Sequence, residues 1–177
     1  MAVGNGFIAA GNHILVVGQG NDTVDGWLGA SIYQQHFGDN IIYAPPPLDL
    51  AAERSHASFV RQQILAGKIN AAHDVSDGGL AVAIAEMAMK SGLGASIETP
   101  DSSLLHGWAF GEDQARFVVS TADDATLIAA AKDAGIEITK IGIVIEDSEL
   151  KFGDGDTISV TEIRGVFESC IPSLMAG

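Results

Sequence analysis

The sequence contains few positive charges and a single cysteine. Nine lysines and arginines face 23 aspartates and glutamates, which gives a formal net charge of −14 at pH 7 and a pI near 4.4. A negative field of this kind disfavours nucleic acids and anionic membranes as partners. Cys170 has no second cysteine to pair with, so an internal disulfide is excluded and a reducing, cytoplasmic location is expected.

Several kinds of motif are also missing. No apolar run approaches the ~20 residues that cross a membrane, and the N-terminus lacks the pattern of a secretory signal. The sequence has no Walker loop, no dinucleotide fingerprint, no paired cysteines and no histidine–glutamate zinc motif. Asp154 and Asp156 lie in a loop that is too short for the helix-loop-helix calcium pattern. The sequence therefore gives no signal for a metal site in this chain.

Length and hydropathy indicate one ordered domain. Of the 177 residues, 47% are hydrophobic and 18% are charged, which suits a sizeable core and is unlike a disordered segment. Residues 1–12 are rich in glycine and are predicted to form a flexible N-terminal segment. The remainder, residues 13–177, is predicted to be a single domain.

Apolar patterning predicts strands that alternate with helices. Strands are expected at 13–18, 70–73, 95–98, 117–120 and 136–145, followed by a hairpin of 150–152 with 157–160. Helices are expected at 50–67, 80–91, 122–134 and 162–175, the first capped by Asp49 and the last broken by Pro172. Residues 99–108 fit either a short helix or a loop. This order predicts an α/β (α+β) fold with a mixed β-sheet and helices mainly on one face.

The most distinctive stretch is residues 72–80, Ala-His-Asp-Val-Ser-Asp-Gly-Gly-Leu, which precedes an almost wholly apolar segment. It predicts a polar turn that leads into a buried helix. Asp77 or Ser76 is expected to cap this helix, while Gly78 and Gly79 allow positive φ and a close approach of backbone or ligand. The buried face is expected to carry the apolar residues at helical spacing, which are Leu80, Ala83, Ile84, Met87 and Ala88.

A glycine-rich turn at a helix start commonly receives phosphate, because free amides and the helix dipole favour an anion. Here Asp74 and Asp77 would repel a bare phosphate. A metal-bridged phosphate, a sugar hydroxyl or an amine is therefore the better candidate ligand, and the alternative is a well-capped helix that binds nothing. His73 could serve as a general base, but a hydrogen bond within the turn is the favoured role.

The second polar stretch is Gly-Glu-Asp-Gln-Ala-Arg at 111–116, at the entrance to an apolar strand. Arg116 is one of four arginines in a strongly acidic chain. A guanidinium beside Glu112 and Asp113 can bind phosphate with two hydrogen bonds. It can equally tie the loop together through these carboxylates or through the aspartates near His73, and the residues alone leave both roles open.

Both stretches carry a resemblance to a known family. Residues 73–88, His-Asp-Val-Ser-Asp-Gly-Gly-Leu-Ala-Val-Ala-Ile-Ala-Glu-Met-Ala, and 110–120, Phe-Gly-Glu-Asp-Gln-Ala-Arg-Phe-Val-Val-Ser, resemble the C-terminal domain of phosphoribosylformylglycinamidine synthases. These enzymes belong to the aminoimidazole ribonucleotide (AIR) synthetase-related superfamily, and the resemblance covers nearly the whole chain. At 28–31 the family's Leu-Gly-Gly-Ser is Leu-Gly-Ala-Ser, so Ala30 departs from the pattern.

The resemblance implies a ligase of purine biosynthesis. The family converts formylglycinamide ribonucleotide to its amidine, using ATP and Mg²⁺ to activate the amide oxygen and glutamine-derived ammonia to displace the phosphate. Its implied partners are a glutaminase subunit and a small assembly subunit. The essential histidine, magnesium ligands and nucleotide site lie in several hundred residues that precede this domain, so the chain alone is expected to be inactive and to form structure and cleft.

The same resemblance implies a set of cleft residues, with no catalytic or metal ligand among them. They are Asp74, Asp77, Gly78, Gly79, Glu112, Gln114 and Arg116. Two alternatives stay open: the equivalent domain of a selenophosphate- or thiamine-phosphate-type enzyme of the superfamily, and a non-catalytic interaction module.

Overall fold

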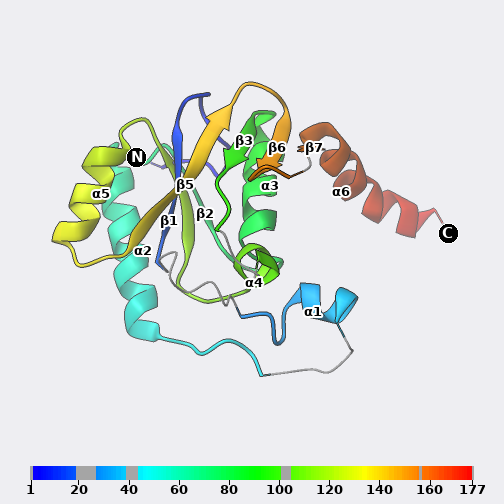
Figure 1. Cartoon of the computed structure of the whole chain (residues 1–177), viewed down its shortest axis with the longest axis horizontal. Coiled ribbons are helices and arrows are strands. Elements are labelled where there is room, and N and C mark those ends of the chain that lie inside the picture. The colour runs from blue at the N-terminus through cyan, green and yellow to red at the C-terminus, as the bar shows by residue number, and fades with distance from the viewer. Residues whose placement is uncertain (1, 19–26, 39–43, 101–104, 156, 177) are drawn as a thin grey trace.

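The chain folds around one mixed β-sheet with helices on both sides (Figure 1). The computed structural model describes residues 2–18, 27–38, 44–100, 105–155 and 157–176. The strands are β1 (His13–Val17), β2 (Ala71–Asp74), β3 (Gly94–Ile97), β4 (Phe117–Thr121), β5 (Ile138–Ile145), β6 (Glu149–Phe152) and β7 (Thr157–Ser159). The helices are α1 (Ile32–Phe37), α2 (Leu50–Leu65), α3 (Gly79–Ser91), α4 (Leu105–Phe110), α5 (Asp124–Asp133) and α6 (Val160–Met175).

The seven strands lie in the order β2-β4-β1-β5-β3-β6-β7. All neighbours pair antiparallel except β3 with β6, which is parallel, so the predicted mixed sheet is confirmed. Strand β1 pairs with β4 on one side and β5 on the other, and its pairing with β5 has a register shift between Ile14 and Leu15. Each expected strand is present, and the expected hairpin of β6 and β7 also forms.

Helices cover both faces of the sheet rather than mainly one, which corrects the expectation from the sequence. Ile14 and Val16 of β1 belong to a core that includes the buried residues of α3, whereas Leu15 and Val17 belong to a second core with α2 and α5. Because strand side chains alternate between faces, the two cores lie on opposite sides of the sheet. The order of elements could not decide this, since each helix is free to cross over either face.

The α3 face of the sheet holds the larger core. The predicted stripe of this helix is buried as expected, with Leu80, Ala83, Ile84, Met87 and Ala88 each at most 3% exposed. The helix ends at Ser91, and its C-cap residue Gly92 adopts φ +80° and donates its backbone N–H to the Ala88 carbonyl. Residues 99–108, which fitted a helix or a loop, contribute the start of α4 at Leu105, and residues 101–104 lie outside the described residues.

The N-terminal segment that was predicted to be flexible contacts this core in its described part. Phe7 is 3% exposed and packs in the core of the α3 face. The Ala72 N–H donates to the Gly4 carbonyl at 3.2 Å, and the Gly11 N–H donates to the Val144 carbonyl at 2.9 Å. These contacts join residues 2–12 to the domain. The buried aromatic ring of Phe7 supplies a large apolar contact, which the glycine-rich composition of the segment does not indicate.

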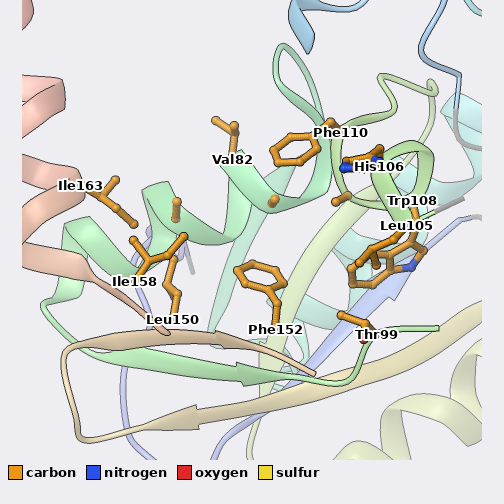
Figure 2. Close-up of a pocket in the computed structure, with 13 residues that line it drawn as sticks. Val82, Thr99, Leu105, His106, Trp108, Phe110, Leu150, Phe152, Ile158 and Ile163 are labelled. Carbon is orange, nitrogen blue, oxygen red and sulfur yellow. The ribbon is translucent and has the colours of Figure 1, made fainter. Parts of the chain in front are cut away.

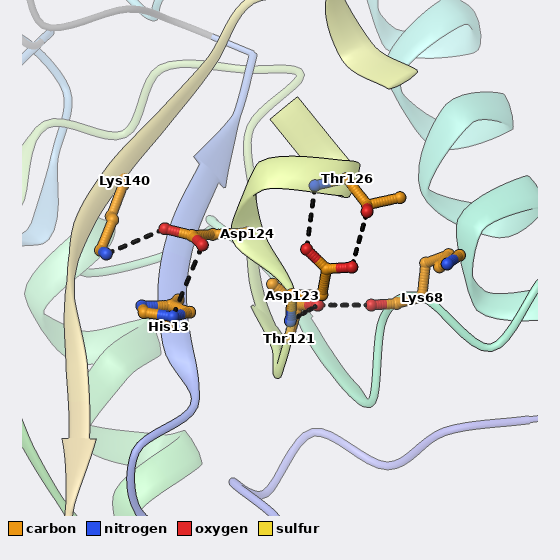
Figure 3. Close-up of polar contacts among 7 residues, drawn as sticks. All are labelled: His13, Lys68, Thr121, Asp123, Asp124, Thr126 and Lys140. Carbon is orange, nitrogen blue, oxygen red and sulfur yellow. Dashed lines mark hydrogen bonds and ion pairs between the residues drawn. The ribbon is translucent and has the colours of Figure 1, made fainter. Parts of the chain in front are cut away.

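The α2 and α5 face is fixed by caps and ion pairs. Asp49 caps α2 through the Ala51 and Ala52 N–H groups, as expected, and Asp123 caps α5 through Thr126. Figure 3 shows Asp124 reaching from α5 to the sheet, where its Oδ2 accepts from Lys140 Nζ at 2.9 Å and its Oδ1 lies 3.5 Å from His13 Nε2. The hydrogen bond to Lys140 lowers the pKa of Asp124 most strongly.

The last helix, α6, continues through Pro172 to Met175, so the predicted break there is wrong. Proline removes one helical N–H, but the Ala176 N–H still donates to the Pro172 carbonyl at 3.0 Å and closes the final turn. None of the helices in the described ranges is long and apolar enough to span a bilayer.

Candidate functional site

The polar turn after β2 packs directly against the loop 111–116. The Val75 N–H donates to the Arg116 carbonyl at 2.9 Å, and the Gly79 N–H donates to the Ser76 carbonyl at 3.0 Å. Gly78 and Gly79 both adopt positive φ, +81° and +75°. A Cβ at Gly79 would lie 2.6 Å from the Phe110 carbonyl carbon and 2.8 Å from the Gly111 oxygen. Gly79 is therefore required for backbone-to-backbone packing, whereas a Cβ at Gly78 would meet the Val82 side chain at 2.6 Å.

Glu112 supplies the cap of α3, and the predicted cap by Asp77 or Ser76 is wrong. The N-cap residue is Gly78, with no side-chain cap of its own. Instead, Glu112 Oε1 accepts from the Gly78 N–H at 2.8 Å and from the Ile32 N–H at 2.9 Å. One carboxylate thus sits at the N-termini of α3 and α1, where the helix dipoles stabilise negative charge. The left-handed pair of glycines moves the helix start past Asp77, which stays exposed.

Arg116 ties the loop together from inside. Its side chain is 6% exposed, and Nη2 donates to the Gly111 carbonyl at 2.7 Å and lies 3.2 Å from Asp113 Oδ2. Burial lowers the pKa of the Arg116 guanidinium, and the nearby Asp113 charge opposes that shift. Asp113 Oδ2 also accepts from the Trp27 N–H at 3.0 Å. Nη2 makes both of these Arg116 contacts, and the buried Nε has no hydrogen-bond partner among the described residues. Neither partner of Arg116 is Asp74 or Asp77.

Two supporting contacts had no signal in the sequence. The Trp27 carbonyl accepts from the Glu112 N–H at 3.1 Å, so the segment before α1 is bound to the loop in both directions. His56 Nδ1 of α2 lies 2.7 Å from the Ala115 carbonyl, and Ala115 adopts φ +63°. Only the folded chain brings these residues to the loop, since they are remote from it in sequence.

The remaining candidates lie on the surface of this arrangement. Asp74, Asp77 and Gln114 are exposed, and Gln114 Nε2 donates to the Glu112 carbonyl at 3.3 Å. His73 is held between elements, with Nε2 2.9 Å from Glu86 Oε2 of α3 and Nδ1 2.7 Å from the Asp74 carbonyl. This agrees with a hydrogen-bonded histidine rather than a free general base. The structure therefore joins Gly78, Gly79, Glu112 and Arg116 in one unit.

Comparison with known proteins identifies the family. Residues 9–155 match the model described as "AIR synthase related protein, C-terminal domain". The chain belongs to this family. It is 44% identical over 172 residues to the phosphoribosylformylglycinamidine synthase subunit PurL of Methylocella silvestris and 42% identical over 174 residues to that of Parvibaculum lavamentivorans. Each match covers 96% of this chain but 23% of the relative, so the chain spans about a quarter of the proteins it matches.

Solved structures show the same AIR synthase C-terminal fold. The PurL protein of Thermotoga maritima complexed with FGAR aligns with a TM-score of 0.72 and 19% identity, over 90% of this chain and 29% of that one. The hydrogenase maturation protein HypE of Escherichia coli aligns with a TM-score of 0.59 and 17% identity, over 89% and 51% of the two chains. At these identities the likeness establishes the fold alone.

The Mg²⁺ that the resemblance implies does not find a ligand set among the described side chains of this domain. Mg²⁺ needs several convergent oxygen ligands. Glu112 and Asp113 already accept backbone N–H groups, and Asp113 also pairs with Arg116. Asp74 and Asp77 are exposed, and Asp74 Oδ1 lies 3.6 Å from His73 Nδ1. Within the residues that the structure describes, no three histidine, cysteine or acidic side chains are grouped to hold a metal.

Proposed function

We propose that this chain is the C-terminal domain of the synthetase subunit of a phosphoribosylformylglycinamidine synthase. The observation that carries the proposal is the 44% identity to PurL of Methylocella silvestris across 96% of the chain. The enzyme converts formylglycinamide ribonucleotide, ATP and glutamine-derived ammonia to formylglycinamidine ribonucleotide in the cytoplasm. ATP and Mg²⁺ serve the chemistry in the rest of the subunit, and a glutaminase subunit and a small assembly subunit complete the complex.

In this proposal the domain supplies structure and one wall of a cleft, and it is inactive alone. The polar groups that could have done chemistry are used internally. Glu112 caps two helices, Arg116 bridges Gly111 and Asp113, and His73 is bonded to Glu86. A general base or phosphate clamp needs a group that is free to reach its substrate.

The cleft assignment rests on which candidates stay accessible. Asp74, Asp77 and Gln114 are exposed beside the turn that Gly78, Gly79, Glu112 and Arg116 hold in place. Carboxylates and an amide suit a sugar hydroxyl or a metal-bridged phosphate better than a bare phosphate. The first three therefore contact ligand in the assembled enzyme, and the other four position them.

A domain exchange tests this function. The quarter of the Methylocella silvestris synthetase that matches this chain is replaced by it, and amidine formation is measured with ATP, Mg²⁺, ammonia and formylglycinamide ribonucleotide. We expect a turnover within about tenfold of the natural enzyme, equal to about 1.4 kcal/mol in activation free energy. A folded exchange protein that binds substrate but forms no amidine contradicts the proposal.

The matched control carries the corresponding domain of Escherichia coli HypE, which has the same fold at 17% identity to this chain. That protein should form no amidine if the specific sequence of the domain matters. Equal activity from both exchange proteins would mean that any domain of this fold suffices, which contradicts the assignment to this enzyme.

A further inference from the structure

The outward side of α3 forms the wall of a long apolar groove. Two adjoining pockets of about 360 and 390 Å³ share Val82, Ala85, Ile158 and Ile163. In Figure 2, Phe110 of α4, Phe152 of β6 and Ile158 of β7 border the first pocket from three different elements. The second pocket continues along α3 to α6. The groove is therefore bounded at one end by α4 and at the other by α6.

The apolar face of α6 extends the groove beyond the body of the domain. Val160 is 2% exposed and Ile163 packs against the core, but Phe167 and Ile171 are each 63% exposed and Leu174 is 75% exposed. The spacing of these five residues places them on one helical face. Figure 1 shows α6 running away from the sheet toward the C-terminus. The stripe that anchors the helix thus continues without cover from the described residues.

A continuous exposed apolar face of this kind marks an interaction surface. We call the residues Val82, Ala85, Ile158, Ile163, Phe167, Ile171 and Leu174 the groove–α6 surface. A second copy of the chain is a poor occupant, because each copy carries a net charge of −14 and two copies repel each other. The occupant must also suit a lining that is mostly apolar, with Glu86, Thr99, His106 and Glu162 as its polar residues.

The relatives are much longer than this chain, and their remaining residues are the occupant that we infer for this surface. The chain covers 23% of the Methylocella silvestris synthetase, so about three quarters of that polypeptide is available to pack against this domain at a fixed ratio of one to one. We propose that the groove–α6 surface is where the rest of the synthetase polypeptide docks, through an apolar segment. The inference rests on the proposed function, and it assigns the contact to the α3, α4 and α6 side rather than to the α2 and α5 side.

Hydrogen exchange compares the isolated chain with the domain-exchange protein. We expect the backbone N–H groups of 167–175 to exchange at least about tenfold more slowly in the exchange protein, because docking removes local opening of α6. Unchanged exchange in a protein that forms amidine would overturn the docking inference while leaving the proposed function intact. Lost amidine formation with protected α6 would overturn the function instead and support the docking.

Matched variants locate the contact. Val82→Asp and Phe167→Asp place a charge on the groove–α6 surface, and Ile128→Asp on α5 is the control, since Ile128 is 37% exposed and Val82 36%. In the exchange protein the two groove variants should lose the protection of 167–175, and the control should keep it. Each variant should unfold like the parent chain when it is studied in isolation. For Phe167→Asp this is expected because Phe167 is 63% exposed. Equal protection in all three variants, or a concentration-dependent dimer of the isolated chain that protects α6, would overturn the inference.

Discussion

Removing the Glu112 carboxylate tests how the polar loop supports the fold. Glu112 Oε1 accepts from the N–H groups of Gly78 and Ile32 at 2.8 and 2.9 Å. In Glu112→Ala the buried Gly78 N–H loses its acceptor, which costs about 1–3 kcal/mol. Water replaces the acceptor at Ile32, because that residue is exposed. We expect the free energy of unfolding to fall by about 2 kcal/mol, a Tm decrease of about 4–8 °C for a domain of this size.

Urea unfolding followed by circular dichroism, together with Tm, measures this change in the isolated chain. Glu112→Gln keeps an oxygen at the same place and should lose less than about 1 kcal/mol, since a neutral acceptor replaces a charged one. Glu146→Ala removes an exposed carboxylate from the end of β5 and controls for net charge. If Glu112→Ala and Glu146→Ala unfold within about 0.5 kcal/mol of each other, Glu112 does not cap these helices.

Three further changes test the site and the sheet. Gly79→Ala should lower the free energy of unfolding in urea by at least about 3 kcal/mol, because its Cβ would meet the Phe110 and Gly111 backbone at 2.6–2.8 Å. The control Gly92→Ala, at φ +80° in open space, should lower it by only the ~1 kcal/mol that a left-handed alanine costs. Equal losses in the two variants would refute the packing argument. Arg116→Ala leaves Asp113 without its ion partner and should lower the free energy of unfolding by about 3 kcal/mol. The control Arg61→Ala, at an exposed arginine, should lower it by less than about 0.5 kcal/mol. A similar loss in both variants would contradict the buried ion pair of Arg116 and Asp113. The pKa of Asp124 is lowered from 3.8, chiefly by the Lys140 hydrogen bond, so its contribution to stability is present above pH 3.8 and is lost as the pH falls below that value. In Asp124→Asn the free energy of unfolding should therefore fall less steeply below about pH 4 than in the parent chain. An unchanged dependence on pH would contradict the stabilising role of the Asp124–Lys140 hydrogen bond.

Local patterns predicted the elements well. The helical spacing from Leu80 to Ala88 identified the buried face of α3, and Asp49 capped α2 as the sequence indicated. These features depend on neighbours within one or two turns, where side-chain periodicity and capping chemistry act. The order of strands and helices likewise predicted the mixed sheet. The resemblance carried by residues 73–88 and 110–120 predicted the family, which the comparisons confirm.

Long-range contacts explain what the sequence could not predict. Glu112 caps a helix whose N-cap residue, Gly78, lies 34 residues earlier in the chain, and no local pattern distinguishes Glu112 from Asp77 as a cap. Phe7 packs under α3 from a glycine-rich segment, although its neighbours give no periodic signal. The exposed groove–α6 surface is also invisible in the sequence, because Phe167 and Ile171 continue the same apolar stripe as the buried Val160.

The central claim is that this domain supports the synthetase without performing its chemistry. Amidine formation measured side by side for the isolated chain and for the Methylocella silvestris enzyme that carries it tests this most directly. The account predicts background turnover for the isolated chain with ATP, Mg²⁺ and ammonia, and turnover within about tenfold of the natural enzyme for the exchange protein. Turnover by the isolated chain well above background would contradict the account.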